Sequence, residues 1–279
     1  MFHSVIGQDA LNVRGCGALD IRFRPLSDGH GPIDRAYQSG CLRMRLPRVK
    51  DGAFSNAVLL NTAGGLCDGD RLDQKLAWAD GASALVTTQA AEKVYRATDQ
   101  GARISTSIEV GDGARAEWLP QETILFDHAR LCRQTDVRLS SNSNFLGCEA
   151  VVLGRTAMGE RVEEGLLEDR WRIWREGRLI YADAQRLAGP IDANMARAPV
   201  GGGARAMALV IHASQAAGTL LAPARAAAES VHGLMAVSSW GPLLVVRLLA
   251  QDGAVLRHDL GVALRALRGG RPNPRIWGC

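Results

Sequence analysis

The stretch "RISTSIEV", residues 103–110, alternates polar and apolar side chains with a period of two. The members of its apolar side are Ile104, Thr106, Ile108 and Val110. Successive side chains of an extended chain point to opposite faces, so this alternation predicts a half-buried β-strand. The segment "RLDQKLAW" (71–78) repeats the pattern, and "LCRQTDVRL" (131–139) repeats it more weakly.

Turn signals interrupt these runs at short intervals between about residues 20 and 190. They are Asp80-Gly81, Gly111-Asp112-Gly113, the polar "SSNSN" from Ser140, and Glu176-Gly177. Short strands at this spacing predict a mainly β body, either a sandwich or a coiling sheet, with little helix. No internal repeat indicates a propeller or another repeat architecture.

The pattern changes after Gly189-Pro190. The apolar runs "AMALVIHA" (206–213) and "LLVVRLLA" (243–250) predict buried strands. Helix formers follow Pro223, with Gly233 as the stop, and "VLRHDLGVALRALRGG" places an apolar stripe opposite its arginines. The part from about 200 to 279 is therefore predicted to be α+β and to pack on the same body, within one domain spanning 1–279. The terminal "RPNPRIWGC" is predicted to be an extended docking tail.

Composition excludes several classes of protein. The apolar and charged fractions, 47% and 22%, are ordinary for a globular protein. No apolar run approaches the roughly 20 residues of a membrane-spanning helix. The stretch 1–15 lacks a basic segment followed by an apolar core, so we expect a cytoplasmic location. Six dispersed cysteines without any C-x-x-C predict free thiols, and dispersed histidines argue against a structural zinc site.

The glycine-rich stretch "LLNTAGGLCDGDRL" (59–72) looks at first like a phosphate-binding loop. Such a loop needs a Lys-Ser/Thr pair and a helix after its last glycine, but Gly69 precedes Asp70-Arg71 and a strand pattern. An EF-hand fails as well, because Leu72 stands where an oxygen ligand is required. The residues by themselves predict a strand, a turn and another strand.

Five motifs occur in one order along the chain. They are "LLNTAGGLCDGDRL", "TTQAAEKVYR" from Thr87, "EWLPQETILFDHAR" from Glu117, "FLGCEAVVLGRTAMGE" from Phe145, and the terminal "PRIWGC". Together they resemble the urease accessory protein D family (UreD, also called UreH), from about residue 20 to the C-terminus. The resemblance implies a mainly β body, a coiling, helix-like stack of β-sheets, with two C-terminal α-helices.

The resemblance also implies a function. Members of this family are cytoplasmic, non-enzymatic maturation factors that bind the accessory protein UreF, which recruits the nickel-carrying GTPase UreG. The complex, in which a dimer is expected, docks on apo-urease and delivers Ni²⁺ through a water-filled tunnel. No cofactor is expected to stay bound, nickel passes transiently, and neither nucleic acid nor a membrane is an expected partner.

The match assigns candidate residues to that nickel path. Asp70, Glu149 and Asp183 align with acidic tunnel residues of the family, and Glu92 falls at a tunnel-lining position. Arg71 departs from the family, because an acidic residue is frequent there. Carboxylates suit passage, since oxygen ligands hold Ni²⁺ less tightly than imidazole or thiolate, and a conduit needs weak sites.

Each candidate has a structural alternative. Asp70 could cap the turn, and Glu149 could form an ion pair with Arg155 or another arginine. Cys67 and Cys148 lie near two of these carboxylates in sequence; we interpret them as core or tunnel-lining thiols, because free cysteine is commonly buried.

The arginine-rich C-terminus is predicted to bind a protein partner, with Trp277 as an apolar anchor. Its rim residues would be Arg265, Arg268 and Arg275. Two other functions compete with this interpretation. A carbohydrate-active β-fold enzyme would use carboxylates as acid and base, but the sequence pairs no two of them. A nucleic-acid-binding protein would use the same arginines, but aromatic residues are only 5% of the chain.

Overall fold

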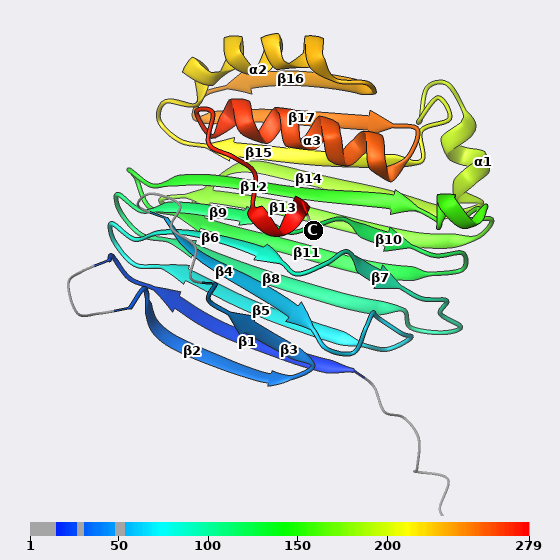
Figure 1. Ribbon diagram of the computed structural model, residues 1–279, viewed down its shortest axis with the longest axis horizontal. Coiled ribbons are helices and arrows are strands. Elements are labelled where there is room, and N and C mark those ends of the chain that lie inside the picture. Colours follow the sequence, from blue (N-terminus) through cyan, green and yellow to red (C-terminus); the bar gives the residue numbers. More distant parts are fainter. Residues whose placement is uncertain (1–14, 27–30, 48–53, 279) are drawn as a thin grey trace, which may run out of the picture.

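The computed structural model describes residues 15–26, 31–47 and 54–278, and strands dominate it (Figure 1). The prediction of a cytoplasmic location rests mostly on the stretch 1–14, which lies outside the described residues. Among the described residues, no helix combines the length and the apolar composition needed to cross a membrane.

The described strands form two sheets. Across the first sheet, which has seven strands, the order is β14 (Arg178–Gly189), β13 (Gly165–Arg175), β11 (Arg130–Leu139), β8 (Ala102–Val110), β5 (Arg71–Trp78), β1 (Cys16–Phe23) and β2 (Ile33–Gly40). The second sheet, with ten strands, has β16 (Leu234–Trp240), β17 (Leu243–Ala250), β15 (Ala206–Ala213), β12 (Asn144–Leu153), β9 (Arg115–Leu119), β6 (Ser83–Thr88), β4 (Ser55–Asn61) and β3 (Leu42–Arg45); β10 (Thr123–Leu125) joins β12 to β7 (Glu92–Val94).

The chain coils between the two sheets. It passes from β5 to β6, then to β8, β9, β11, β12 and β13, changing sheet at each step apart from the short strands β7 and β10. Consecutive turns of the coil stack strands of the same sheet in parallel, as in β5–β8–β11–β13 and β4–β6–β9–β12. The predicted mainly β, coiling stack is confirmed.

The predicted strands lie where the alternation placed them. β8 buries Ile104, Thr106, Ile108 and Val110 and exposes Arg103. The main core fills the space between the two sheets. β15 pairs with β12, so the C-terminal part continues the second sheet.

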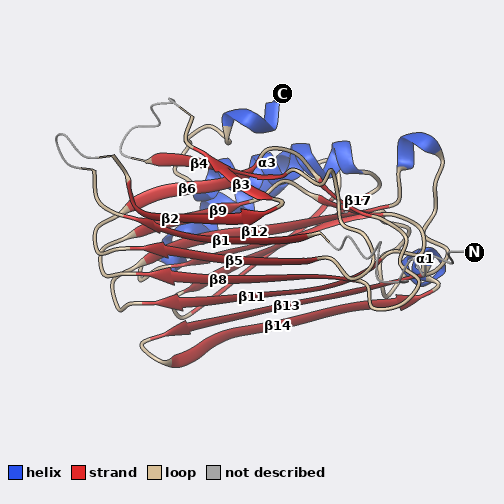
Figure 2. Cartoon of the chain, turned by 90° about the horizontal axis from the view of Figure 1, so that it is seen from below, coloured by secondary structure: helices blue, strands red, loops and turns tan. Residues whose placement is uncertain are grey.

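Helices cover the outer face of the second sheet. α3 (Gly253–Leu267) packs on β15 and β17 over a second apolar core, and α2 (Leu221–Ala227) packs beside it (Figure 2). The remaining helical pieces are α1 (Ile191–Ala196) and the 3₁₀ turns η1 (Thr156–Met158), η2 (Ala217–Leu220), η3 (Ala228–Ser230) and η4 (Arg275–Gly278).

The two predicted C-terminal helices are confirmed, but both ends of the first one differ from the prediction. α2 begins before Pro223, which the first turn of a helix accommodates, and η3 ends the helical segment at Ser230 rather than at Gly233. The C-terminal tail, predicted to be extended, has no regular secondary structure over 271–274 and then forms the 3₁₀ turn η4.

Candidate functional site

The glycine-rich segment between β4 and β5 carries the chain from the second sheet to the first. Its last four residues form a turn in which the N–H of Asp70 donates to the carbonyl of Cys67 (3.2 Å). Gly69 has a φ of 82°, which favours glycine over residues with a Cβ atom. Strand β5 follows directly, as predicted, so the loop leads into a strand and not into a helix.

Both aspartates of this loop fix backbone groups. Asp70 is buried, and its carboxylate accepts hydrogen bonds from the N–H groups of Gly15 (2.6 Å) and Cys67 (2.8 Å). The turn-capping role considered for Asp70 is therefore present. Asp68 accepts from the N–H groups of Gly101 (2.6 Å) and Asp99 (2.8 Å). These bonds outweigh burial and lower the pKa of Asp68, a residue that the sequence reasoning missed although it lies in the same motif.

Glu92 lies near Asp70, at the edge of a cavity of about 170 Å³ that Gln74 also lines. Burial, with a smaller contribution from the Asp70 charge, raises the pKa of Glu92 to about 7. The Asn61 side-chain amide donates to both of its carboxylate oxygens (3.1 and 3.2 Å). The Cys67 residue is exposed, but partial desolvation of its thiol and then the Asp70 charge raise the pKa of that thiol, which disfavours a metal-trapping thiolate.

Glu149 forms an ion pair inside the core. Its carboxylate contacts the guanidinium of Arg133, which also contacts Asp169 (2.5 Å). All three side chains are at most 7% exposed. The arginine considered by sequence, Arg155, pairs instead with Glu160 (2.9 Å). Burial is the main cause that raises the pKa of Glu149, and Arg133 opposes it.

Asp183, on β14, lines a cavity of about 240 Å³ together with Glu149 and Asp169. Arg247, on β17, pairs with the Asp183 carboxylate (2.7 Å), and the Tyr181 hydroxyl donates to the same oxygen (3.2 Å). Strands from both sheets therefore supply charged groups to one cavity.

The predicted path residues fall into two groups. Glu149 and Asp183 share the larger of these two cavities, whereas Asp70, Glu92 and Cys67 lie together near the start of β5. Asp70 does not line the Glu149–Asp183 cavity.

A row of buried polar residues lies between the two groups. Gln74, Thr106 and Thr135 occupy the same register position on β5, β8 and β11, and the Thr106 hydroxyl donates to Gln74 (3.1 Å). Within the described part of the chain, the Thr135 hydroxyl, one Asp169 oxygen and the Arg133 Nε find no hydrogen-bond partner. Buried polar atoms of this kind usually bind water. In the sequence, each of these three strands shows a polar residue among the apolar residues of its inward-facing side.

The predicted partner-binding residues differ in exposure. Arg265 and Arg275 are exposed. Arg268 is buried and pairs with Glu117 (2.9 Å), and the buried Trp277 indole donates to the Thr87 hydroxyl (3.0 Å). In this structure Arg268 and Trp277 attach the tail to the β body, and partner binding by these four residues stays a prediction.

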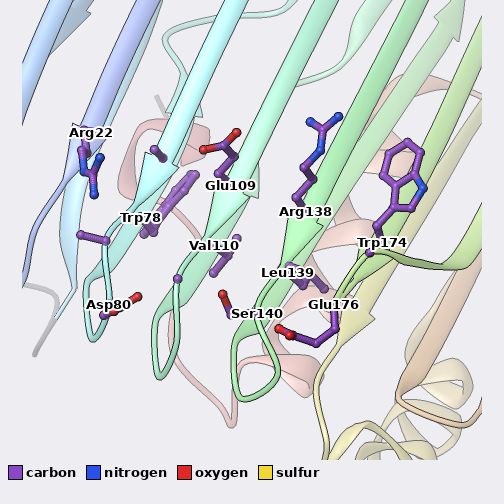
Figure 3. A pocket seen from close by; sticks show the side chains of 14 residues that line it. Arg22, Trp78, Asp80, Glu109, Val110, Arg138, Leu139, Ser140, Trp174 and Glu176 are labelled. Atoms are coloured by element: carbon purple, nitrogen blue, oxygen red, sulfur yellow. The ribbon is translucent and has the colours of Figure 1, made fainter.

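A hollow of about 620 Å³ lies on the outer face of the first sheet (Figure 3). Its side chains include Arg22, Glu109, Arg138 and Trp174 from neighbouring strands. Charges of both signs alternate across it, and none of the predicted path residues lines it.

The chain is similar to known proteins over almost its whole length. Residues 15–278 match the family described as "UreD urease accessory protein". A urease accessory protein UreD of Rhizobium etli is 47% identical over 252 residues, which cover 90% of this chain and 91% of that protein. One of Bradyrhizobium diazoefficiens is 44% identical over 271 residues, which cover 96% and 95%.

Proposed function

This chain belongs to the UreD urease accessory protein family, and we propose that it is a maturation factor of urease rather than an enzyme. In this proposal the chain binds UreF in the cytoplasm, recruits UreG through UreF, forms a dimer within the accessory complex, and docks on apo-urease. Ni²⁺ is the cargo, and the chain offers it an interior path with no permanently bound cofactor.

The row of buried polar groups between the two cavities is the observation that supports this path. It begins beside Glu92 at Gln74 and continues through Thr106 to Thr135, whose register partner on β13, Trp171, lines the cavity of Glu149. Three steps between neighbouring strands, from β5 to β13, span about 14 Å. Apolar side chains at these positions would stabilise the core better, because burying an unpaired polar atom costs free energy.

The charges near Glu149 suit a dication that passes without being stored. Arg133 offsets one of the two negative charges of Glu149 and Asp169, and Arg247 offsets that of Asp183. With all five groups ionised, the net charge of this group is −1, which attracts a cation weakly. Burial, and then Glu149, raise the pKa of the neighbouring Cys148 thiol, so a thiolate does not compete for the ion.

Conservative variants test the path. Asp70→Asn, Glu149→Gln, Asp183→Asn and the charge-reversing Glu149→Lys would each be co-expressed with UreF, UreG and urease. Complex recovery and the nickel content of urease would then be measured. We expect recovery to persist and nickel content to fall in the three conservative variants. Nickel content should be lowest for Glu149→Lys, because a fixed positive charge repels the dication.

The exposed Glu109, on the outer face of the first sheet, provides the matched control, and Glu109→Gln should load nickel normally. Normal loading in all four path variants would exclude the conduit. Loss of the complex together with the nickel would show that these carboxylates serve the fold and would contradict their role in transport.

A further inference from the structure

Two histidines and one aspartate meet on the helix-covered side of the molecule, outside the interior path. His232 lies between η3 and β16, and His258 and Asp259 are neighbours on α3. The two imidazole rings stack with centroids 4.3 Å apart and planes 1° apart. One ligand atom from each of the three residues lies within 4.8 Å of the others, and no other group of this kind occurs among the described residues.

The loop before β16 and the helix fix this arrangement together. The buried Asp259 carboxylate accepts hydrogen bonds from the N–H groups of His232 (2.9 Å) and Gly233 (2.8 Å). The same carboxylate approaches Nδ1 of His258 at 3.0 Å. The carboxylate is therefore anchored, whereas both histidines are exposed.

We propose that His232, His258 and Asp259 form a surface binding site for a borderline divalent transition-metal ion such as Ni²⁺ or Zn²⁺. Two imidazole nitrogens and one carboxylate oxygen are ligands that these ions accept, and water completes the coordination. The ion binds beside the contact between Nδ1 of His258 and the Asp259 oxygen and replaces the proton of that contact, so that the two atoms become adjacent ligands. A rotation of the exposed His232 ring out of the stack directs its nitrogen to the same ion.

This site is separate from the Glu149–Asp183 cavity. Asp259 belongs to α3, which packs on the outer core of the second sheet. Arg247 contacts Asp183 in the interior cavity, and none of the three proposed ligands is among the residues that line that cavity in the described structure. Metal binding here consequently does not depend on transport through the interior.

The test uses the full chain without a histidine tag, freed of metal by a chelating resin. Calorimetric titration with Ni²⁺, and the visible absorption of bound Co²⁺, would be compared among wild type, His232→Ala and His258→Ala. We expect each variant to lose about tenfold or more in affinity, since even outer partners of metal ligands contribute 10- to 100-fold. The His128→Ala variant is the control, because His128 lies outside the proposed site. Its Nε2 is 3.4 Å from a carboxylate oxygen of Asp127.

Circular dichroism would establish that the variants remain folded. Binding that is weakened in both site variants and retained in His128→Ala supports the site. Equal binding in wild type and both site variants would overturn it, as would no binding by wild type at millimolar metal. Binding that Glu149→Gln removes and the histidine variants retain would assign the ion to the interior and also overturn this proposal.

Discussion

The guanidinium of Arg133, on β11 of the first sheet, pairs with the carboxylate of Glu149, on β12 of the second, so that an ion pair joins the two sheets through the core. Asp169, on the strand beside β11, shares the same guanidinium. Removing one member of a buried ion pair leaves an uncompensated charge. Arg133 therefore holds Glu149, which is proposed for the nickel path, together with Asp169.

Replacing Arg133 by methionine should destabilise the chain by about 3 to 5 kcal/mol, because Glu149 and Asp169 then lose their counter-charge in the core. Urea denaturation would measure the change. The exposed Arg103, on the adjacent strand β8, is the control, and Arg103→Met should stay within about 0.5 kcal/mol of wild type. Adding Glu149→Gln to Arg133→Met should recover part of the lost stability. Equal denaturation midpoints for wild type and Arg133→Met would show that Arg133 does not stabilise the core through its charge.

Glu92→Gln should stabilise the chain in a pH-dependent way. Burial raises the pKa of Glu92 from 4.5 to about 7, so folding opposes its ionisation. That cost is absent well below pH 4.5, grows between pH 4.5 and 7, and is complete above pH 7. The variant should therefore gain about 1 to 3 kcal/mol at pH 8 and much less at pH 5, as measured by denaturation at both pH values. A gain that is equal at the two pH values would contradict the raised pKa.

Asp70→Ala should lower stability by about 1 to 3 kcal/mol, because the N–H groups of Gly15 and Cys67 lose their acceptor. Asp70→Asn should cost less, since one acceptor oxygen remains. Thermal unfolding of both variants would measure this order. Unchanged melting of Asp70→Ala would show that the carboxylate does not stabilise the turn.

Trp277→Ala should destabilise the chain by about 3 to 5 kcal/mol through lost burial and the lost hydrogen bond to Thr87. The exposed Arg265→Ala should leave stability unchanged within about 0.5 kcal/mol. Co-purification with UreF tests the predicted interface separately from stability. Arg265→Ala should reduce the amount of complex recovered if that interface is correct. Full recovery of the complex with Arg265→Ala would remove that residue from the interface.

Local patterns in the sequence determined the elements. The alternation in 103–110 predicted β8, its buried face and the strands that resemble it, because side-chain alternation depends only on neighbouring residues. The apolar runs predicted β15 and β17, and the amphipathic stripe predicted α3, for the same reason. The ordered motifs indicated the family, which the comparisons confirm.

Only the tertiary structure decided which side chains meet. Arg155 is close to Glu149 in sequence, but the ion-pair partner of Glu149 is Arg133. Which side chains meet across the core depends on how strands from successive turns of the coil are aligned. The buried row from Gln74 to Thr135 and the approach of His232 to α3 have the same origin. Contacts between residues distant in the chain depend on the pairing of strands and the packing of helices, and local patterns do not specify these.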